Sequence, residues 1–152
     1  METVKVKNSR QIPNGFTGIA EFANGSKKWY LDGEPHRVDG PAYEGADGSK
    51  EWWLNGKLHR VDGPAIEFAD GRKEWWLNGK RHRVDGPAVE GADGTKVWWL
   101  NYNHVFTLKP IGEYLIIEDG LPSTTEWLGN PVSTLKVLTA EGIQFIPNLP
   151  GI

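Results

Sequence analysis

A seven-residue string that recurs at a fixed interval constrains the fold of this chain more than any other sequence feature. The string HRVDGPA begins at His36, His59 and His82, so each copy starts 23 residues after the one before. One column of tryptophans keeps the same interval: Trp29, Trp52, Trp75 and Trp98. A repeat of this length is one supersecondary unit, which buries its apolar side by stacking on its neighbours. The sequence therefore predicts a tandem array.

The interval divides the 152 residues into three parts. Residues 1–16 form a lead-in, residues 17–104 hold four units of the repeat, and residues 105–152 do not follow the pattern. The fourth unit departs from the pattern where the Asn-Gly of earlier units becomes Asn101-Tyr102. We expect the last part to be a β cap or an oligomerisation segment, because a repeat array needs a cap over its terminal apolar edge.

Two turn signals in each unit predict an all-β fold. An Asp-Gly pair such as Asp47-Gly48 alternates with an Asn-Gly pair such as Asn55-Gly56. Both pairs tolerate positive φ and are favoured in two-residue hairpin loops. The residues between them, SKEWWL or RKEWWL, have the length of a strand and contain neither glycine nor proline. The predicted fold is a meander of tandem 23-residue hairpin repeats that forms an elongated sheet, with a C-terminal β cap.

The strands pair in a defined register if both loops have two residues. Trp53 then lies opposite Leu58, and Tyr43 lies opposite Trp52. Because alternate side chains point to opposite faces, one face is predicted to be buried. It collects Trp52, Leu54, His59, Val61, Tyr43, Ile66 and Phe68. The other face collects Trp53, Glu44, Glu51, Arg60 and Asp62. A change of one residue in either loop would exchange the faces.

The aromatic residues of the second face are candidates for partner binding: Tyr30, Trp53, Trp76 and Trp99. Trp is enriched at interface hot spots, and flat rings also stack on sugars or bases. Two alternatives stay open. Another layer of the protein covers these rings, or the array dimerises through them.

The arginines of the repeat, Arg37, Arg60 and Arg83, are the second candidates. A guanidinium fork suits a phosphate or another planar anion, so this column could hold a small anionic ligand. The alternative, which we favour, is an ionic ladder with the glutamates of the strands and the aspartate of HRVD.

The histidines of the repeat are interpreted as packing residues and not as metal ligands. With two strands in each repeat, equivalent histidines lie about 9–10 Å apart, too far apart for one ion. The sequence also carries no catalytic serine, zinc-protease or phosphate-loop motif. We therefore predict no enzyme activity, no cofactor and no metal.

The last part of the chain is predicted to contain three strands. Tyr114–Ile117 forms one strand, and Leu135–Leu138 pairs with Ile143–Ile146 across residues 139–142. A cap is the favoured assignment for this part, and a separate module for oligomerisation or target binding is the alternative. The apolar, proline-rich run at residues 145–152 could be a docking tail.

Charge and composition exclude several classes of protein. The net charge of −3 argues against DNA binding, which needs clustered Lys and Arg. The chain contains no cysteine, and it has no apolar run as long as a signal peptide or a membrane span. We expect a cytoplasmic location, in the cell that produces the chain or in an infected cell.

The repeats resemble the MORN family through WWLNGKLHRVDGPA and WWLNGKRHRVDGPA, which echo its aromatic strand, Asn-Gly-Lys turn and following histidine. The resemblance covers residues 17–104. It departs in having Arg37, Arg60 or Arg83 where the family has glycine, and in the added DGPA, so that each unit has two or three strands. The resemblance implies a binding scaffold, mostly for proteins and sometimes for anionic lipid, without catalysis. Related repeats occur in bacterial and viral proteins.

These observations together predict a non-enzymatic scaffold that binds a protein partner through a face of aromatic, Arg and Glu side chains. The near identity of residues 40–62 and 63–85 suggests recent duplication, which is typical of a phage or bacterial inhibitor of a host factor. One alternative is a binder of a nucleotide or glycan on the Trp and Arg columns. The other is a structural component that forms a homo-oligomer.

Overall fold

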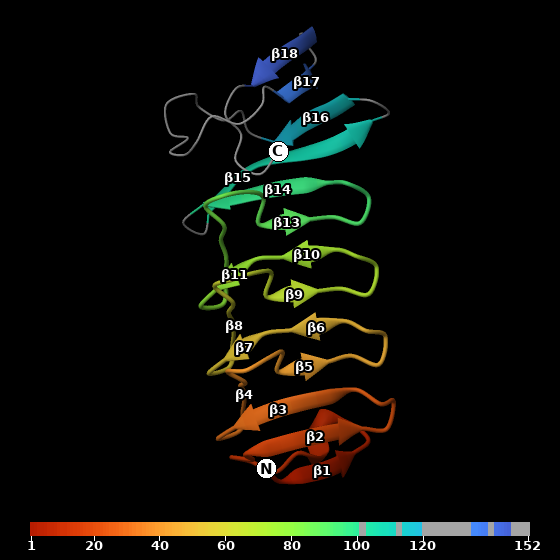
Figure 1. Cartoon of the computed structure of the whole chain (residues 1–152), viewed down its shortest axis with the longest axis vertical. Helices are drawn as coiled ribbons and strands as arrows, with labels where there is room; N and C mark the ends of the chain where they lie inside the picture. The colour runs from red at the N-terminus through yellow and green to blue at the C-terminus, as the bar shows by residue number, and fades with distance from the viewer. Residues whose placement is uncertain (101–102, 112–113, 120–134, 140–141, 147–152) are drawn as a thin grey trace. The chain divides into compact units, whose positions relative to one another are not determined.

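The computed structural model describes residues 1–100, 103–111, 114–119, 135–139 and 142–146 (Figure 1). These residues form an all-β protein, as predicted, in which helix is limited to one turn of 3-10 helix. They fall into two compact units, residues 1–80 and residues 81–152. The boundary differs from the division at residues 16 and 104 that the repeat suggests. That division stays a prediction.

The first unit is built on one ladder of seven strands. Its order is β1-β2-β3-β5-β6-β9-β10, and all neighbours are antiparallel except β1 and β2, which are parallel. Its elements are β1 (Thr3–Val6), η1 (Ser9–Gln11), β2 (Gly18–Phe22), β3 (Lys27–Leu31), β4 (Glu34–Pro35), β5 (Tyr43–Glu44), β6 (Lys50–Glu51), β7 (Trp53–Leu54), β8 (Lys57–Leu58), β9 (Ile66–Glu67), β10 (Lys73–Glu74) and β11 (Trp76–Leu77). β12 (Lys80–Arg81) spans the boundary between the units.

The Asn-Gly pair between β7 and β8, Asn55-Gly56, forms the predicted two-residue hairpin loop. Trp53 lies opposite Leu58 and Leu54 opposite Lys57, so β7 and β8 form a small sheet of their own beside the ladder. Both loop residues have positive φ, +48° at Asn55 and +69° at Gly56. The residue pair tolerates this conformation, which matches the twist of the flanking strands. Residues 43–58 thus contain four short strands (β5 to β8), more than the two or three considered from the sequence.

The Asp-Gly loops have three residues, so the prediction of two was wrong. The Gly45 N–H donates to the Ser49 carbonyl at 2.8 Å, which leaves residues 46–48 as the loop. The third loop residue, Gly48, has a φ of +92°. Asp47 closes the turn by accepting the Ser49 N–H at 3.0 Å. A three-residue loop that ends in a positive-φ glycine is the next commonest hairpin connection after the two-residue loop.

The extra loop residue shifts the register and corrects the predicted faces. Tyr43 lies opposite Glu51 and not opposite Trp52, and Glu44 lies opposite Lys50. Tyr43 therefore shares its face with Glu51, from which it had been separated in the prediction. Val61 was also placed on the buried face, but for a different reason it is 83% exposed: it lies in the loop between β8 and β9 and not in a strand. As expected for a sheet, a slip of one residue moved side chains to the other face.

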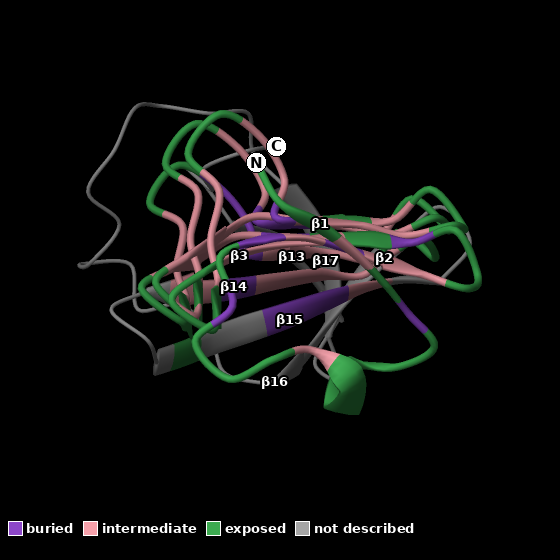
Figure 2. Ribbon diagram, turned by 90° about the horizontal axis from the view of Figure 1, so that it is seen from below, coloured by how far each residue is buried: buried purple, intermediate pink, exposed green. Residues whose placement is uncertain are grey.

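The first unit buries small residues along the ladder and larger ones near its N-terminal edge and at Ile66 and Glu74 (buried residues are purple in Figure 2). Ala42 and Ala65 are fully buried where the chain returns into the ladder, and their carbonyls accept the Trp29 and Trp52 N–H groups at 2.8 Å. A side chain larger than alanine would not fit there without a shift of the strands. The side chains of Val6 and Phe16 in the lead-in are also buried. The lead-in therefore supplies both the edge strand β1 and apolar side chains that pack at this edge of the sheet.

The strands of the second unit have the order β13-β14-β15-β16-β17-β18. Its strands are β13 (Val89–Glu90), β14 (Lys96–Leu100), β15 (Asn103–Ile111), β16 (Tyr114–Asp119), β17 (Leu135–Thr139) and β18 (Gly142–Ile146). The predicted strand at residues 114–117 and the predicted hairpin are confirmed, with Leu138 opposite Ile143. The role of this part as a cap stays a prediction. The proposed docking tail lies largely outside the described residues, which end at residue 146.

The positive φ at the third loop position gives a first prediction. Gly48→Ala should lower the free energy of unfolding by about 1–2 kcal/mol, because an L side chain is strained at this φ even where space is open. Gly48→Asn should cost less, since Asn tolerates positive φ better. Urea unfolding measures both variants. Equal stability of Gly48→Ala and the wild type would contradict the described loop.

Candidate functional site

The cross-strand register divides the side chains of residues 1–80 between two faces of the ladder. One row runs across the strands through Ala20, Lys28, Tyr43, Glu51, Ile66 and Glu74. With Tyr30, Trp53 and Trp76, this row is called the aromatic face. The adjacent row runs through Glu21, Lys27, Glu44, Lys50, Glu67 and Lys73. With Trp29, Trp52, Arg37 and Arg60, it is called the arginine face.

Arg37 organises the HRVDGPA loop on the arginine face. Its guanidinium lies over the Trp29 ring, with Cζ 4.2 Å from the ring centroid. Nε donates to the Asp39 carboxylate at 2.9 Å, and Nη1 donates to the Pro41 carbonyl at 3.2 Å and to Glu44 at 3.1 Å. One side chain thus joins a strand, the loop and the next strand. Charged hydrogen bonds of this kind are stronger than neutral ones.

Glycine in the DGPA element lets the guanidinium approach the backbone. A Cβ on Gly40 would lie 3.1 Å from Arg37 Cζ, and a Cβ on Gly63 would lie 3.0 Å from Arg60 Cζ. The guanidinium therefore lies between an indole ring and a glycine backbone. The same contacts recur at Arg60, whose Cζ is 3.9 Å from the Trp52 centroid. This geometry depends on the presence of tryptophan, arginine and glycine in the same repeat.

The three arginines make the same bonds in each copy. Arg60 donates to Asp62, Pro64 and Glu67, and Arg83 of the second unit donates to Asp85, Pro87 and Glu90. The favoured ionic ladder is therefore present, with these glutamates as partners. The hydrogen bonds from Arg37 and Arg60 hold the pKa of Asp39 and of Asp62 below the usual range.

The histidines join neighbouring copies and are not arranged around an ion. His36 Nδ1 accepts the Asn55 N–H at 3.2 Å and lies 2.9 Å from Asn55 Oδ1, and His59 makes the same contacts with Asn78. Each histidine therefore holds the Asn-Gly turn of the next copy. Among the residues that the structure describes, no group of three or more His, Cys, Asp or Glu side chains could hold a metal ion.

On the aromatic face, each tryptophan is held by an acid of its own copy. Trp53 Nε1 donates to Glu51 at 2.7 Å, and Trp76 Nε1 donates to Glu74 at 2.9 Å. Tyr30, Trp53 and Trp76 are all half-buried. The rings are therefore fixed in position while part of their surface stays accessible.

Lys28 lies among three rings of the aromatic face. Its Nζ is 5.1 Å from the Trp53 centroid and 6.0 Å from the centroids of Tyr30 and Tyr43. Burial lowers the pKa of Lys28, and the nearby Glu51 carboxylate opposes this shift. Arg72 reaches Glu74 at 3.5 Å, so the two acids of this face each have a basic neighbour. Attraction between a cation and aromatic faces adds to the order of the rings.

The structure separates the predicted site residues. Tyr30, Trp53 and Trp76 lie on the aromatic face, whereas Arg37 and Arg60 lie on the arginine face, so the expectation of one shared face was wrong. The reason is the alternation at Trp52 and Trp53: Arg60 stacks on the first, and Glu51 binds the second. In the second unit, Trp99 is half-buried beside Arg81 and the His104 ring.

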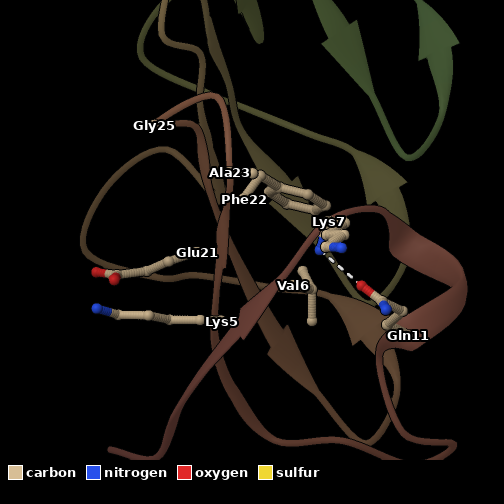
Figure 3. A pocket seen from close by; sticks show the side chains of 8 residues that line it. All are labelled: Lys5, Val6, Lys7, Gln11, Glu21, Phe22, Ala23 and Gly25. Carbon is tan, nitrogen blue, oxygen red and sulfur yellow. Dashed lines mark hydrogen bonds between the residues drawn. The ribbon is translucent and has the colours of Figure 1, made fainter.

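An open depression lies beside the lead-in (Figure 3). Its lining includes Lys5, Glu21 and Phe22, and the Gln11 side chain accepts the Lys7 N–H at 2.6 Å. Gln11 thereby ties the end of η1 to the residue that follows β1. The depression contains none of the predicted site residues.

Comparison with models of protein families, with curated proteins and with solved structures found no match. The resemblance to MORN repeats therefore rests only on the short sequence motifs quoted above. Within the described ranges, no helix has the length and apolar character to cross a membrane.

The contact between arginine and glycine gives a second prediction. Gly63→Ala should lower the free energy of unfolding by about 1–3 kcal/mol, because the added methyl group meets the Arg60 guanidinium. In an Arg60→Ala background the same change should cost less, with a coupling of at least about 0.5 kcal/mol in a double-mutant cycle. Additive effects would show that the two residues do not meet.

The lowered pKa of Asp39 and Asp62 gives a third prediction. Their stabilising effect is present above the unfolded-state pKa and is lost as the pH falls through the folded-state pKa. Between neutral pH and about pH 3, the D39N/D62N variant should therefore lose less stability than the wild type. Urea unfolding across this pH range measures the difference. Parallel curves for the two proteins would contradict the prediction.

Proposed function

We propose that this chain is a non-enzymatic scaffold that binds a protein partner through the aromatic face. The observation that carries the proposal is the recurrence of half-buried rings on one face, each tryptophan held by a hydrogen bond to its own glutamate. A ring that is already fixed loses little conformational freedom on binding. Trp and Tyr are also the residues on which interface affinity most often depends.

The proposal gives the arginines a positioning role inside the loops. Their guanidinium groups already bind aspartate, a carbonyl and glutamate, and they stack on the tryptophans of the arginine face, on the side of the ladder opposite to the aromatic face. A nucleotide or other small anion, the alternative ligand, would need both groups on one surface. On the aromatic face the charges of Lys28 and Arg72 balance those of Glu51 and Glu74, which favours a partner without a strong net charge at the contact.

The extension to an inhibitor of a host factor rests on the near identity of two copies of the repeat. A surface made of identical units can change by duplication as a partner changes. The described contacts support this extension only by showing that each copy repeats the same geometry.

The test is a fourth prediction. Trp53→Leu with Trp76→Leu keeps apolar bulk and removes the flat rings and their N–H groups. In affinity capture from lysate of the producing cell, we expect this variant to lose, by about tenfold or more, the partner that the wild type retains. The exposed pair Val38→Ala with Val61→Ala is the matched control and should retain it.

Thermal unfolding and a glycan array complete the test. An unchanged melting temperature with lost capture supports the proposal. A collapse of the melting temperature would instead make the rings part of the core. Capture that is equal for all variants would place the partner elsewhere, and glycan binding that depends on the rings would favour the glycan alternative.

A further inference from the structure

We propose that Asn14 is a site of spontaneous deamidation, and that the reaction weakens the contact between the lead-in and the first copy of the repeat. The residue lies with Gly15 in the exposed loop between η1 and β2. This loop is not part of the aromatic face, so the inference does not depend on the proposed function.

The reaction needs only Asn14, Gly15 and water. The Gly15 nitrogen gives up its proton and attacks Cγ of Asn14. The new N–Cγ bond closes an imide ring, the Cγ–Nδ2 bond breaks, and ammonia leaves with the proton. Water then opens the ring. Cleavage of the new bond gives aspartate, whereas cleavage of the main-chain bond to the Gly15 nitrogen gives isoaspartate, in which the main chain is longer by one carbon. Glycine favours the attack because it has no side chain to obstruct it.

The local sequence alone does not rank the candidate sites. The chain contains four pairs that join the same two residues: Asn14-Gly15, Asn24-Gly25, Asn55-Gly56 and Asn78-Gly79. A hydrogen bond from the glycine N–H to a carbonyl opposes the loss of its proton. A partner on the asparagine side chain keeps the amide from turning toward the nitrogen. The contacts of these two groups therefore rank the pairs.

The two Asn-Gly pairs of the repeat are held at both reacting groups. The Gly56 N–H donates to the Pro35 carbonyl at 3.0 Å, and Asn55 Oδ1 lies 2.9 Å from His36 Nδ1. The pair Asn78-Gly79 repeats both contacts, at 2.9 Å and 3.0 Å. These pairs can react only when the loop leaves the copy before it.

The two remaining pairs differ from each other. Asn24 Oδ1 accepts the Ser26 N–H at 3.0 Å, and the Gly25 N–H donates to the Phe22 carbonyl at 2.9 Å. Among the residues that the structure describes, neither the Gly15 N–H nor the Asn14 side chain has a hydrogen-bond partner. Asn14 is therefore the asparagine whose reacting groups the fold leaves unprotected.

The residues that follow Asn14 hold the first copy of the repeat. The Gly33 N–H donates to the Phe16 carbonyl at 2.9 Å, and the Asp32 N–H donates to the Thr17 hydroxyl at 2.9 Å. Each Asn-Gly loop of the later copies makes the same pair of bonds to the copy before it. Phe16 and Thr17 thus bind the first copy in place of a preceding one.

Deamidation changes the chain where it lies closest to this loop. A Cβ on Gly33 would lie 3.1 Å from the Gly15 nitrogen, so the two backbones are already in contact. Isoaspartate lengthens the main chain at this contact. Either product also adds a negative charge beside the loop that carries Asp32, and like charges repel. The bonds to Asp32 and Gly33 therefore weaken.

The fifth prediction follows deamidation of the full chain at mildly alkaline pH by peptide mapping with mass spectrometry. Cleavage after Glu21 separates Asn14 from Asn24. Asn14 should react at least about tenfold faster than the other three, because a hydrogen-bonded pair reacts only after local opening. In urea that unfolds the chain, the four rates should converge. Asn14→Gln is the matched control: it keeps an amide but closes a larger ring, so position 14 should stay unmodified while the other rates are unchanged.

Amide hydrogen exchange measures the consequence. Ion exchange separates the deamidated chain, since it carries one more negative charge. In this fraction the Asp32 and Gly33 amides should exchange at least about tenfold faster than in the unmodified chain. The Asn55 and Gly56 amides are the internal control and should keep their rates, because the first copy still holds them.

Each half of the inference has a result that overturns it. Similar rates at all four pairs in the folded chain, or the same ranking in urea, would show that the described hydrogen bonds do not select Asn14. Unchanged exchange at Asp32 and Gly33 in the deamidated fraction would show that the lead-in keeps its contact after the reaction.

Discussion

The stacking of an arginine on a tryptophan is the interaction on which the repeat depends. The guanidinium of Arg37 lies on the Trp29 ring and binds the next strand through Glu44, so one contact fixes both the loop and the spacing of the strands. The fully buried residues nearby are alanines, which contribute little apolar area. Where the buried side chains are this small, stability must come from many repeated local contacts. This explains why Trp, Arg, Asp, Gly and Glu recur as one set.

Much of this fold could be predicted from turn chemistry. Asn55-Gly56 gave the correct loop because positive φ at both residues leaves one common solution. Asp47-Gly48 is compatible with both a two-residue and a three-residue loop. The hydrogen bonds of the Gly45 N–H and of the Asp47 side chain stabilise the three-residue loop, and the spacing of residues in the sequence does not reveal them. The single additional residue exchanged the faces. Local sequence therefore predicted the all-β class and the extended segments, but it did not predict that the segment between Gly48 and Asn55 is divided into β6 and β7, and the register needed the geometry of one turn.

The candidate site, like the fold, could be predicted only in part from local sequence. The aromatic column is apparent from spacing, but its separation from the arginines follows from the alternation of Trp52 and Trp53. Lys28 was missed because its three aromatic neighbours come from different strands. The exposure of Val61 was missed because a valine in a regular pattern is ordinarily assigned to the core. The signal that could have shown it is the charged residue on each side of this valine, Arg60 and Asp62.

The bonds between copies have a consequence for how the chain can change in length. The Arg37 N–H donates to the Trp53 carbonyl, and the Arg60 N–H makes the same bond to Trp76. The histidine and asparagine contacts also run from one copy to the next. Every junction in this part of the chain therefore has the same chemistry on both sides. Recombination between two copies can insert or remove a whole unit without creating an unfamiliar junction, so the length of the array is free to vary in evolution while each residue keeps its neighbours.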